Sequence, residues 1–141
     1  MQNISVLIKN YAKSHKHPIN EKIHIFAIPA IMFSIFGILA AIDYLVVIVF
    51  IIFSLMFYLK LSMKAFYLMT VWSLINMLFV YFLFDNILLI SVVTFILGWT
   101  IQFIGHFIEG KKPSFFEDIQ YLLIGPLFVC ENILSRFGWK W

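Results

Sequence analysis

Residues 25–42 read IFAIPAIMFSIFGILAAI and contain no charged side chain. A helix needs about 20 apolar residues to cross the hydrocarbon core of a bilayer, within a range of roughly 17–25. The stretch is therefore long enough for a transmembrane helix, and Asp43 closes it. Three further apolar runs follow, over residues 44–59, 65–84 and 86–108. The sequence thus predicts an all-α integral membrane protein with four transmembrane helices.

The composition supports this class and excludes others. Apolar residues make up 63% of the chain, against roughly 45–50% in soluble domains. Charged residues make up 12%, too few to cover a soluble core. A single cysteine, Cys130, excludes a disulfide framework. The ten Lys and Arg residues are scattered, so nucleic-acid binding is excluded. The length of 141 residues indicates one membrane domain over 1–141.

Short polar breaks separate the predicted spans. Asp43 lies between the first two, and Asp85 precedes the fourth. We expect tight turns at both positions, and therefore two antiparallel helical hairpins.

Two shorter segments flank the spans. In residues 1–16 one helical face carries Ile4, Ile8, Tyr11 and His15. This pattern predicts an N-terminal amphipathic helix that lies in the lipid headgroup region. Near the other end, about residues 116–134, the apolar run spans only 119–130 and contains Gly125-Pro126. That length is typical of a re-entrant or interfacial helix that does not cross.

The basic residues predict the orientation. With four spans, all ten Lys and Arg residues fall on one side of the membrane, whereas the other two loops carry Asp43 and Asp85 and no basic residue. The positive-inside rule makes the basic side cytoplasmic. Both termini are therefore expected in the cytoplasm, and either a bacterial inner membrane or the endoplasmic reticulum fits.

Polar residues gather at the predicted cytoplasmic ends of the first and fourth spans. All four histidines lie there: His15, His17, His24 and His106. Gln102, His106 and Glu109 are spaced i, i+4 and i+7, so they share one helical face. Imidazole with carboxylate suits Fe, Zn or Mn, and such a set with open positions is typical of non-haem Fe(II) oxygen chemistry. A metal site at this end is one interpretation.

Other interpretations stay open on these residues alone. His24 and His106 could be the axial ligands of a haem held between two helices. The protein could instead be a non-enzymatic membrane scaffold with a structural metal. A transporter is disfavoured, because carriers place a carboxylate inside a span, whereas all seven acidic residues here lie at segment ends or in loops. His17 precedes Pro18 and fits a solvated turn.

Two motifs resemble those of the Mpo-like family. The first has a Tyr, a His, a Pro, an Asn and a second His nine residues after the first: Tyr11, His15, Pro18, Asn20 and His24. The second contains Gly98-Trp99, Gln102, Gly105-His106, Glu109-Gly110 and Lys112-Pro113, followed by Gly125-Pro126-Leu127-Phe128 and Glu131. Between the motifs only the hydropathy matches.

The resemblance implies an Fe(II)-dependent dioxygenase of α-oxidation, which shortens long-chain 2-hydroxy fatty acids by one carbon. It implies three iron ligands: His15, His24 and His106. It also implies that Glu109 is a further ligand or supports the ligands, and that Asn20 and Gln102 orient ligands or substrate. The expected partners are a 2-hydroxy fatty acid, O₂ and membrane lipids, and self-association is left open.

Overall fold

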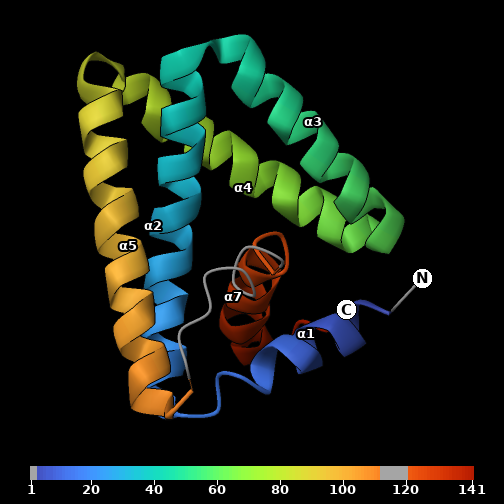
Figure 1. Ribbon diagram of the computed structural model, residues 1–141. Coiled ribbons are helices and arrows are strands. Elements are labelled where there is room, and N and C mark those ends of the chain that lie inside the picture. The colour runs from blue at the N-terminus through green and yellow to red at the C-terminus, as the bar shows by residue number, and fades with distance from the viewer. Residues whose placement is uncertain (1–2, 112–120) are drawn as a thin grey trace. The chain divides into compact units, whose positions relative to one another are not determined.

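The computed structural model describes residues 3–111 and 121–141, and within these ranges the chain forms helices and no strand (Figure 1). The α-helices are α1 (Ile4–Ala12), α2 (Pro18–Ile42), α3 (Tyr44–Leu61), α4 (Met63–Phe82), α5 (Ile87–Glu109) and α7 (Gly125–Leu134). Two short 3₁₀ helices are η1 (Phe84–Asn86) and η2 (Ser135–Phe137). The predicted all-α class is confirmed.

Four of these helices are long and apolar enough to cross a membrane: α2, α3, α4, and α5 together with η1. One boundary differs from the prediction, because α2 begins at Pro18 rather than at residue 25. Proline suits the first turn of a helix, and Nδ1 of His17 accepts a hydrogen bond from the backbone N–H of Ile19 at 3.2 Å. These groups start the helix before the apolar run begins, so His24 lies inside α2.

Single capping residues separate the helices on either side of α3. The carboxylate of Asp43 accepts a hydrogen bond from the backbone N–H of Leu45 at 2.7 Å. The hydroxyl of Ser62 accepts one from the backbone N–H of Ala65 at 3.0 Å. Asp and Ser are preferred at this position because they satisfy amides that the first helical turn leaves unpaired. The predicted tight break at Asp43 is confirmed.

The described part of the chain divides into two compact units, to which α2 and α5 both contribute. Unit 1 comprises Met1–Ile28 and Thr100–Trp141, and unit 2 comprises Pro29–Trp99. In unit 2, α3 and α4 pack side by side (Figure 1). Many large apolar side chains of unit 2 are exposed, among them Phe53, Leu74, Phe82 and Leu89. Such extended apolar surface suits contact with lipid.

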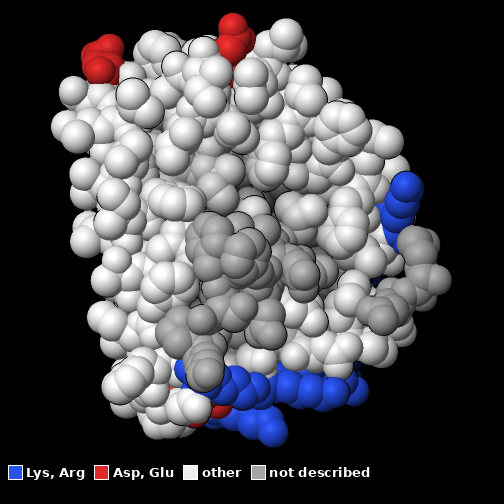
Figure 2. Space-filling model, in the orientation of Figure 1, with Lys and Arg blue, Asp and Glu red and all other residues white. Residues whose placement is uncertain are grey.

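Unit 1 carries a basic edge. In Figure 2 a band of Lys and Arg side chains lies over α1 and the adjoining ends of α2 and α5. Six described lysines of this unit are exposed: Lys9, Lys13, Lys16, Lys22, Lys111 and Lys140.

The apolar face of α1 is the one that the sequence predicts, but its surroundings differ. Ile4, Ile8 and Tyr11 are all buried, and α1 contacts α7. This face therefore meets protein rather than lipid headgroups, since α7 supplies an apolar surface for it. Helix α7 has 10 residues, or about 15 Å at 1.5 Å per residue, too short to cross a bilayer. Residues 116–120 of the predicted non-crossing segment lie outside the described residues.

Candidate metal centre

Three buried histidines of unit 1 meet at one point. One ligand nitrogen from each of His15, His24 and His106 lies within 4.8 Å of the others. The ring centroids are 4.1 Å apart for His15 and His24, and 4.9 Å apart for His24 and His106. His15 follows α1, His24 lies on α2 and His106 lies on α5. The predicted meeting of His24 and His106 is confirmed, and three imidazoles are close enough to bind one metal ion.

Backbone carbonyls fix the protonation of two of these rings. Nδ1 of His15 lies 2.8 Å from the carbonyl oxygen of Tyr11, and Nδ1 of His24 lies 2.9 Å from that of Asn20. A carbonyl oxygen only accepts, so each Nδ1 carries the proton and each Nε2 keeps its lone pair. This neutral tautomer is the form in which histidine binds a metal.

The free nitrogen of His24 is the most specific sign of a ligand. The His24 side chain is 0% exposed. Its Nε2 is buried and has no hydrogen-bond partner within residues 3–111 and 121–141. A buried polar atom without a partner costs free energy. A metal ion held by the three histidines would satisfy this atom, so the residues present fit a metal.

Aromatic side chains pack around His15. The ring of Tyr11 is stacked on the imidazole, with centroids 4.3 Å apart and an interplanar angle of 18°. Phe128 of α7 lies 5.9 Å from the same imidazole, between ring centroids. These contacts restrict the rotation of His15. Sequence reasoning did not predict that the Tyr11 ring stacks on His15 or that the Tyr11 carbonyl oxygen accepts a hydrogen bond from His15. The i, i+4 spacing of Tyr11 and His15 was a usable signal for both contacts. Phe128 gave no such signal.

Glu109, the last residue of α5, forms hydrogen bonds with the loop that follows His15. Its carboxylate accepts hydrogen bonds from the backbone N–H groups of Lys16, at 3.1 Å, and His17, at 2.7 Å. It also accepts one from the side-chain amide of Asn20 at 3.2 Å. The described group of ligand atoms contains the three histidines and not Glu109. The carboxylate thus joins the end of α5 to the loop before α2.

Asn20 occupies the contact between α2 and α5 in unit 1. Its side chain is 0% exposed, and Nδ2 also donates to the carbonyl oxygen of Ser14 at 3.3 Å. A Cβ atom on Gly105 would collide with Oδ1 of Asn20. Glycine beside His106 therefore lets the two helices approach closely enough for their histidines to meet.

Gln102 and His17 are the remaining residues that the sequence analysis singled out. Gln102 is buried, at 4% exposure, one turn before His106 on α5. His17 is not in the described group of possible ligands; it caps α2 and donates its backbone N–H to Glu109. A contact that sequence reasoning missed joins α7 to α2, where the side-chain amide of Asn132 donates to the carboxylate of Glu21.

The donor set has a clear chemical consequence. Three protein nitrogens leave open positions on a metal ion that prefers four to six ligands, and open positions are where substrate or O₂ bind. Structural zinc sites instead use four protein ligands.

Comparison with known proteins gives one match, and it covers nearly the whole chain. The family model described as 2-hydroxy-palmitic acid dioxygenase Mpo1-like matches residues 1–137. No curated protein and no solved structure matches the chain significantly. The matched region includes the three histidines and the four long apolar helices, and it confirms the resemblance inferred from the two sequence motifs. The chain therefore belongs to the 2-hydroxy-palmitic acid dioxygenase Mpo1-like family.

Proposed function

We propose that the protein is an Fe(II)-dependent dioxygenase that converts a long-chain 2-hydroxy fatty acid into the acid one carbon shorter. The observation that carries this proposal is the buried His24 Nε2, aimed with two other imidazoles at one point. The family description supports the reaction and the substrate class. Three imidazoles with open positions suit a catalytic first-row metal, and the dioxygenase description of the family favours a redox-active one.

His15, His24 and His106 would hold the iron. When bound, iron supplies the redox chemistry that activates O₂, which zinc lacks. The neighbouring residues hold the ligands in place. The carbonyl groups of Tyr11 and Asn20 fix the histidine tautomers, and Glu109 holds the loop beside His15. We assign positioning roles to Glu109 and Asn20. We also propose that Gln102, which is buried one turn from His106, orients the ligands or the substrate.

The overall reaction balances without an added reductant. R–CHOH–COOH and O₂ give R–COOH, CO₂ and H₂O. The bond between C1 and C2 breaks, C1 leaves as CO₂, and C2 becomes the new carboxyl carbon. C2 loses three electrons and C1 loses one, and these four electrons reduce the O₂.

The surface of unit 1 suits an amphiphilic substrate. A fatty acid keeps its tail in the bilayer and its carboxylate at the interface. The exposed Lys16, Lys22 and Lys111 belong to the same unit as the three histidines. Positive side chains around a site draw a carboxylate toward it. Under the positive-inside rule, this basic surface supports a reaction at the cytoplasmic face of the membrane.

The haem alternative fits the described geometry less well. A haem with His24 and His106 as axial ligands would have its porphyrin plane between the two imidazoles. The two rings are instead in edge contact, with centroids 4.9 Å apart and an interplanar angle of 75°. Absence of a Soret band in the purified protein is therefore expected.

A product assay tests the proposal. Protein reconstituted with Fe(II) is incubated in air with 2-hydroxypalmitic acid, and the lipids are analysed by mass spectrometry. We expect pentadecanoic acid. Palmitic acid should remain intact, because it lacks the hydroxyl on C2, the carbon that becomes the new carboxyl carbon. A chelator should abolish turnover, and Fe(II) but not Zn(II) should restore it. Unchanged 2-hydroxypalmitic acid with verified iron-loaded protein would reject the proposed function.

A further inference from the structure

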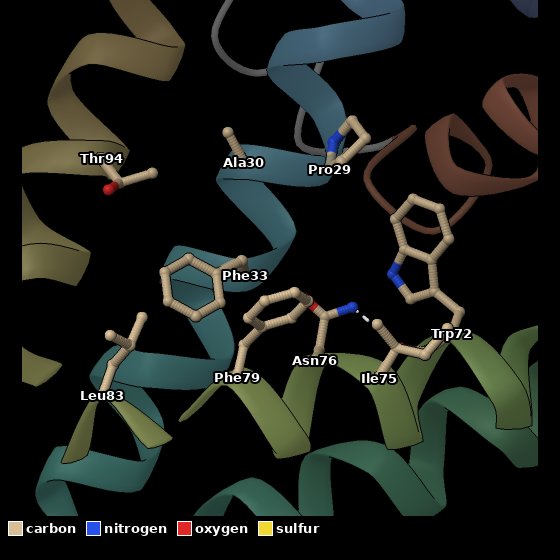
Figure 3. A pocket seen from close by; sticks show the side chains of 9 residues that line it. All are labelled: Pro29, Ala30, Phe33, Trp72, Ile75, Asn76, Phe79, Leu83 and Thr94. Carbon is tan, nitrogen blue, oxygen red and sulfur yellow. Dashed lines mark hydrogen bonds between the residues drawn. The ribbon is translucent and has the colours of Figure 1, made fainter. Parts of the chain in front are cut away.

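Unit 2 contains a cavity of about 490 Å³ that the proposed chemistry does not use (Figure 3). Ligand sites in proteins typically have volumes of about 300–1,000 Å³. Helices α2 and α4 supply most of the lining, which includes Pro29, Ala30, Phe33, Trp72, Asn76 and Phe79. The cavity therefore has the size of a binding site for an organic molecule.

The walls of this cavity are almost entirely carbon. Figure 3 shows the rings of Phe33 and Phe79 on facing helices, with Asn76 between Phe79 and Trp72. The one amide in the lining is turned to its own helix: Nδ2 of Asn76 donates to the backbone carbonyl oxygen of Trp72 at 2.8 Å. A wall of this kind offers a ligand apolar contact and few hydrogen bonds, so it favours a hydrocarbon.

The location of the cavity among membrane-spanning helices indicates which hydrocarbon it could bind. Apolar cavities do not hold water, and an empty one loses the dispersion contacts of its lining. The helices that form this cavity are long and apolar enough to span a membrane, so the molecules around them are lipids with alkyl chains. At roughly 30 Å³ for a group the size of water or methylene, the cavity holds on the order of fifteen such groups. That capacity matches one long alkyl chain.

We propose that this cavity of unit 2 binds the alkyl tail of a long-chain fatty acid. The identity of the chain as a fatty acid rests on the proposed function. Ala30 is the small side chain in the α2 wall and leaves room for the tail. A larger side chain at this position fills the space that the tail occupies.

Fluorescence quenching tests the cavity without metal or turnover. Metal-free protein in detergent is titrated with 9,10-dibromostearic acid, whose bromine atoms quench nearby tryptophans. The Trp72 signal is the difference between the wild type and Trp72→Phe. We expect saturable quenching at one fatty acid per chain. Ala30→Phe should weaken this binding by about tenfold or more, because an overfilled site must be forced open. Ala30→Leu should give a smaller loss in the same direction.

Leu74→Phe is the matched control, because it adds a ring to the outer face of α4, where Leu74 is 65% exposed. It should bind as the wild type does. Three results would overturn the proposal: quenching that never saturates, equal quenching in the wild type and both Ala30 variants, or saturable quenching by a dibrominated phosphatidylcholine but not by the fatty acid. Saturable binding without turnover of a 2-hydroxy acid would reject only the proposed reaction. Turnover without Trp72 quenching would reject only the tail site.

Discussion

Asn20 and Gly105 are in direct contact where α2 packs against α5 in unit 1. The same asparagine donates its amide to Glu109 and accepts the Nδ1–H of His24 at its backbone carbonyl. A single contact between helices therefore joins the residues that position the histidines, and changes at this contact should alter both folding and metal binding.

Gly105→Ala should weaken both properties. The added Cβ would collide with Asn20, so α2 and α5 must separate or Asn20 must leave its place. Overpacking of this kind costs about 1–3 kcal/mol of unfolding free energy. Thermal unfolding in detergent and metal titration would measure both effects. Gly125→Ala is the control, because its Cβ would lie 3.3 Å from the flexible end of Ile28 and should be tolerated. Equal effects of the two substitutions would show that the Asn20 contact is not critical.

Glu109→Gln should lower metal affinity without removing a ligand. Glutamine keeps the size but loses the negative charge that strengthens the hydrogen bonds from Lys16 and His17. Loss of such supporting groups typically lowers metal affinity by about 10–100-fold. Glu131→Gln serves as the control, since no described hydrogen bond joins it to this loop. Isothermal titration with Fe(II) under anaerobic conditions is the measurement. A loss as complete as that of His24→Ala would mean that Glu109 binds the metal itself.

Cys130 should resist alkylation in the folded protein. Its side chain is 8% exposed, and burial raises the pKa of its thiol to about 12. Since the thiolate is the reactive form, iodoacetamide at about pH 8 should modify Cys130 only after denaturation in SDS. Ser135→Cys with Cys130→Ser places a thiol at an exposed position just beyond α7 and should react in the folded state. Rapid modification of native Cys130, detected by mass spectrometry, would contradict the packing of α7.

The orientation inferred from the basic residues predicts which loops a membrane-impermeant thiol reagent can reach. In a Cys130→Ser background, Asp85→Cys should be labelled only from the non-cytoplasmic side of the membrane. Ser62→Cys should be labelled only from the cytoplasmic side, because Lys60 and Lys64 flank it. The reverse pattern would place the basic side, and the histidines with it, on the opposite face.

The apolar runs were sufficient to predict the four long helices, because membrane-spanning length is visible in the sequence itself. They did not predict where α2 begins. A polar residue such as Asn20 limits the apolar run, but it does not limit the helix. Pro18 and His17 start α2 before the first residue of the apolar run. Likewise, periodicity gave the buried face of α1 but could not tell whether lipid or α7 covers it.

Sequence also gave part of the candidate site. An even number of crossings returns the chain to the same side, so His24 and His106 were expected at the same depth of the membrane. The hydrogen bonds of Glu109 could not be predicted in this way, because their donors are backbone N–H groups of Lys16 and His17. Every residue except proline has such a group, and it leaves no pattern in the sequence. The motif residues Lys112 and Pro113 lie outside the described residues.

The iron content of anaerobically purified protein tests the central claim most directly. Wild type, His24→Ala and His17→Ala should be compared by elemental analysis, with circular dichroism to verify that each remains helical. The three-histidine centre predicts one iron per chain in the wild type and in His17→Ala, and none above background in His24→Ala, with the same loss in His15→Ala and His106→Ala. Iron at the same level in all these variants, or no iron in any of them after reconstitution, would contradict it.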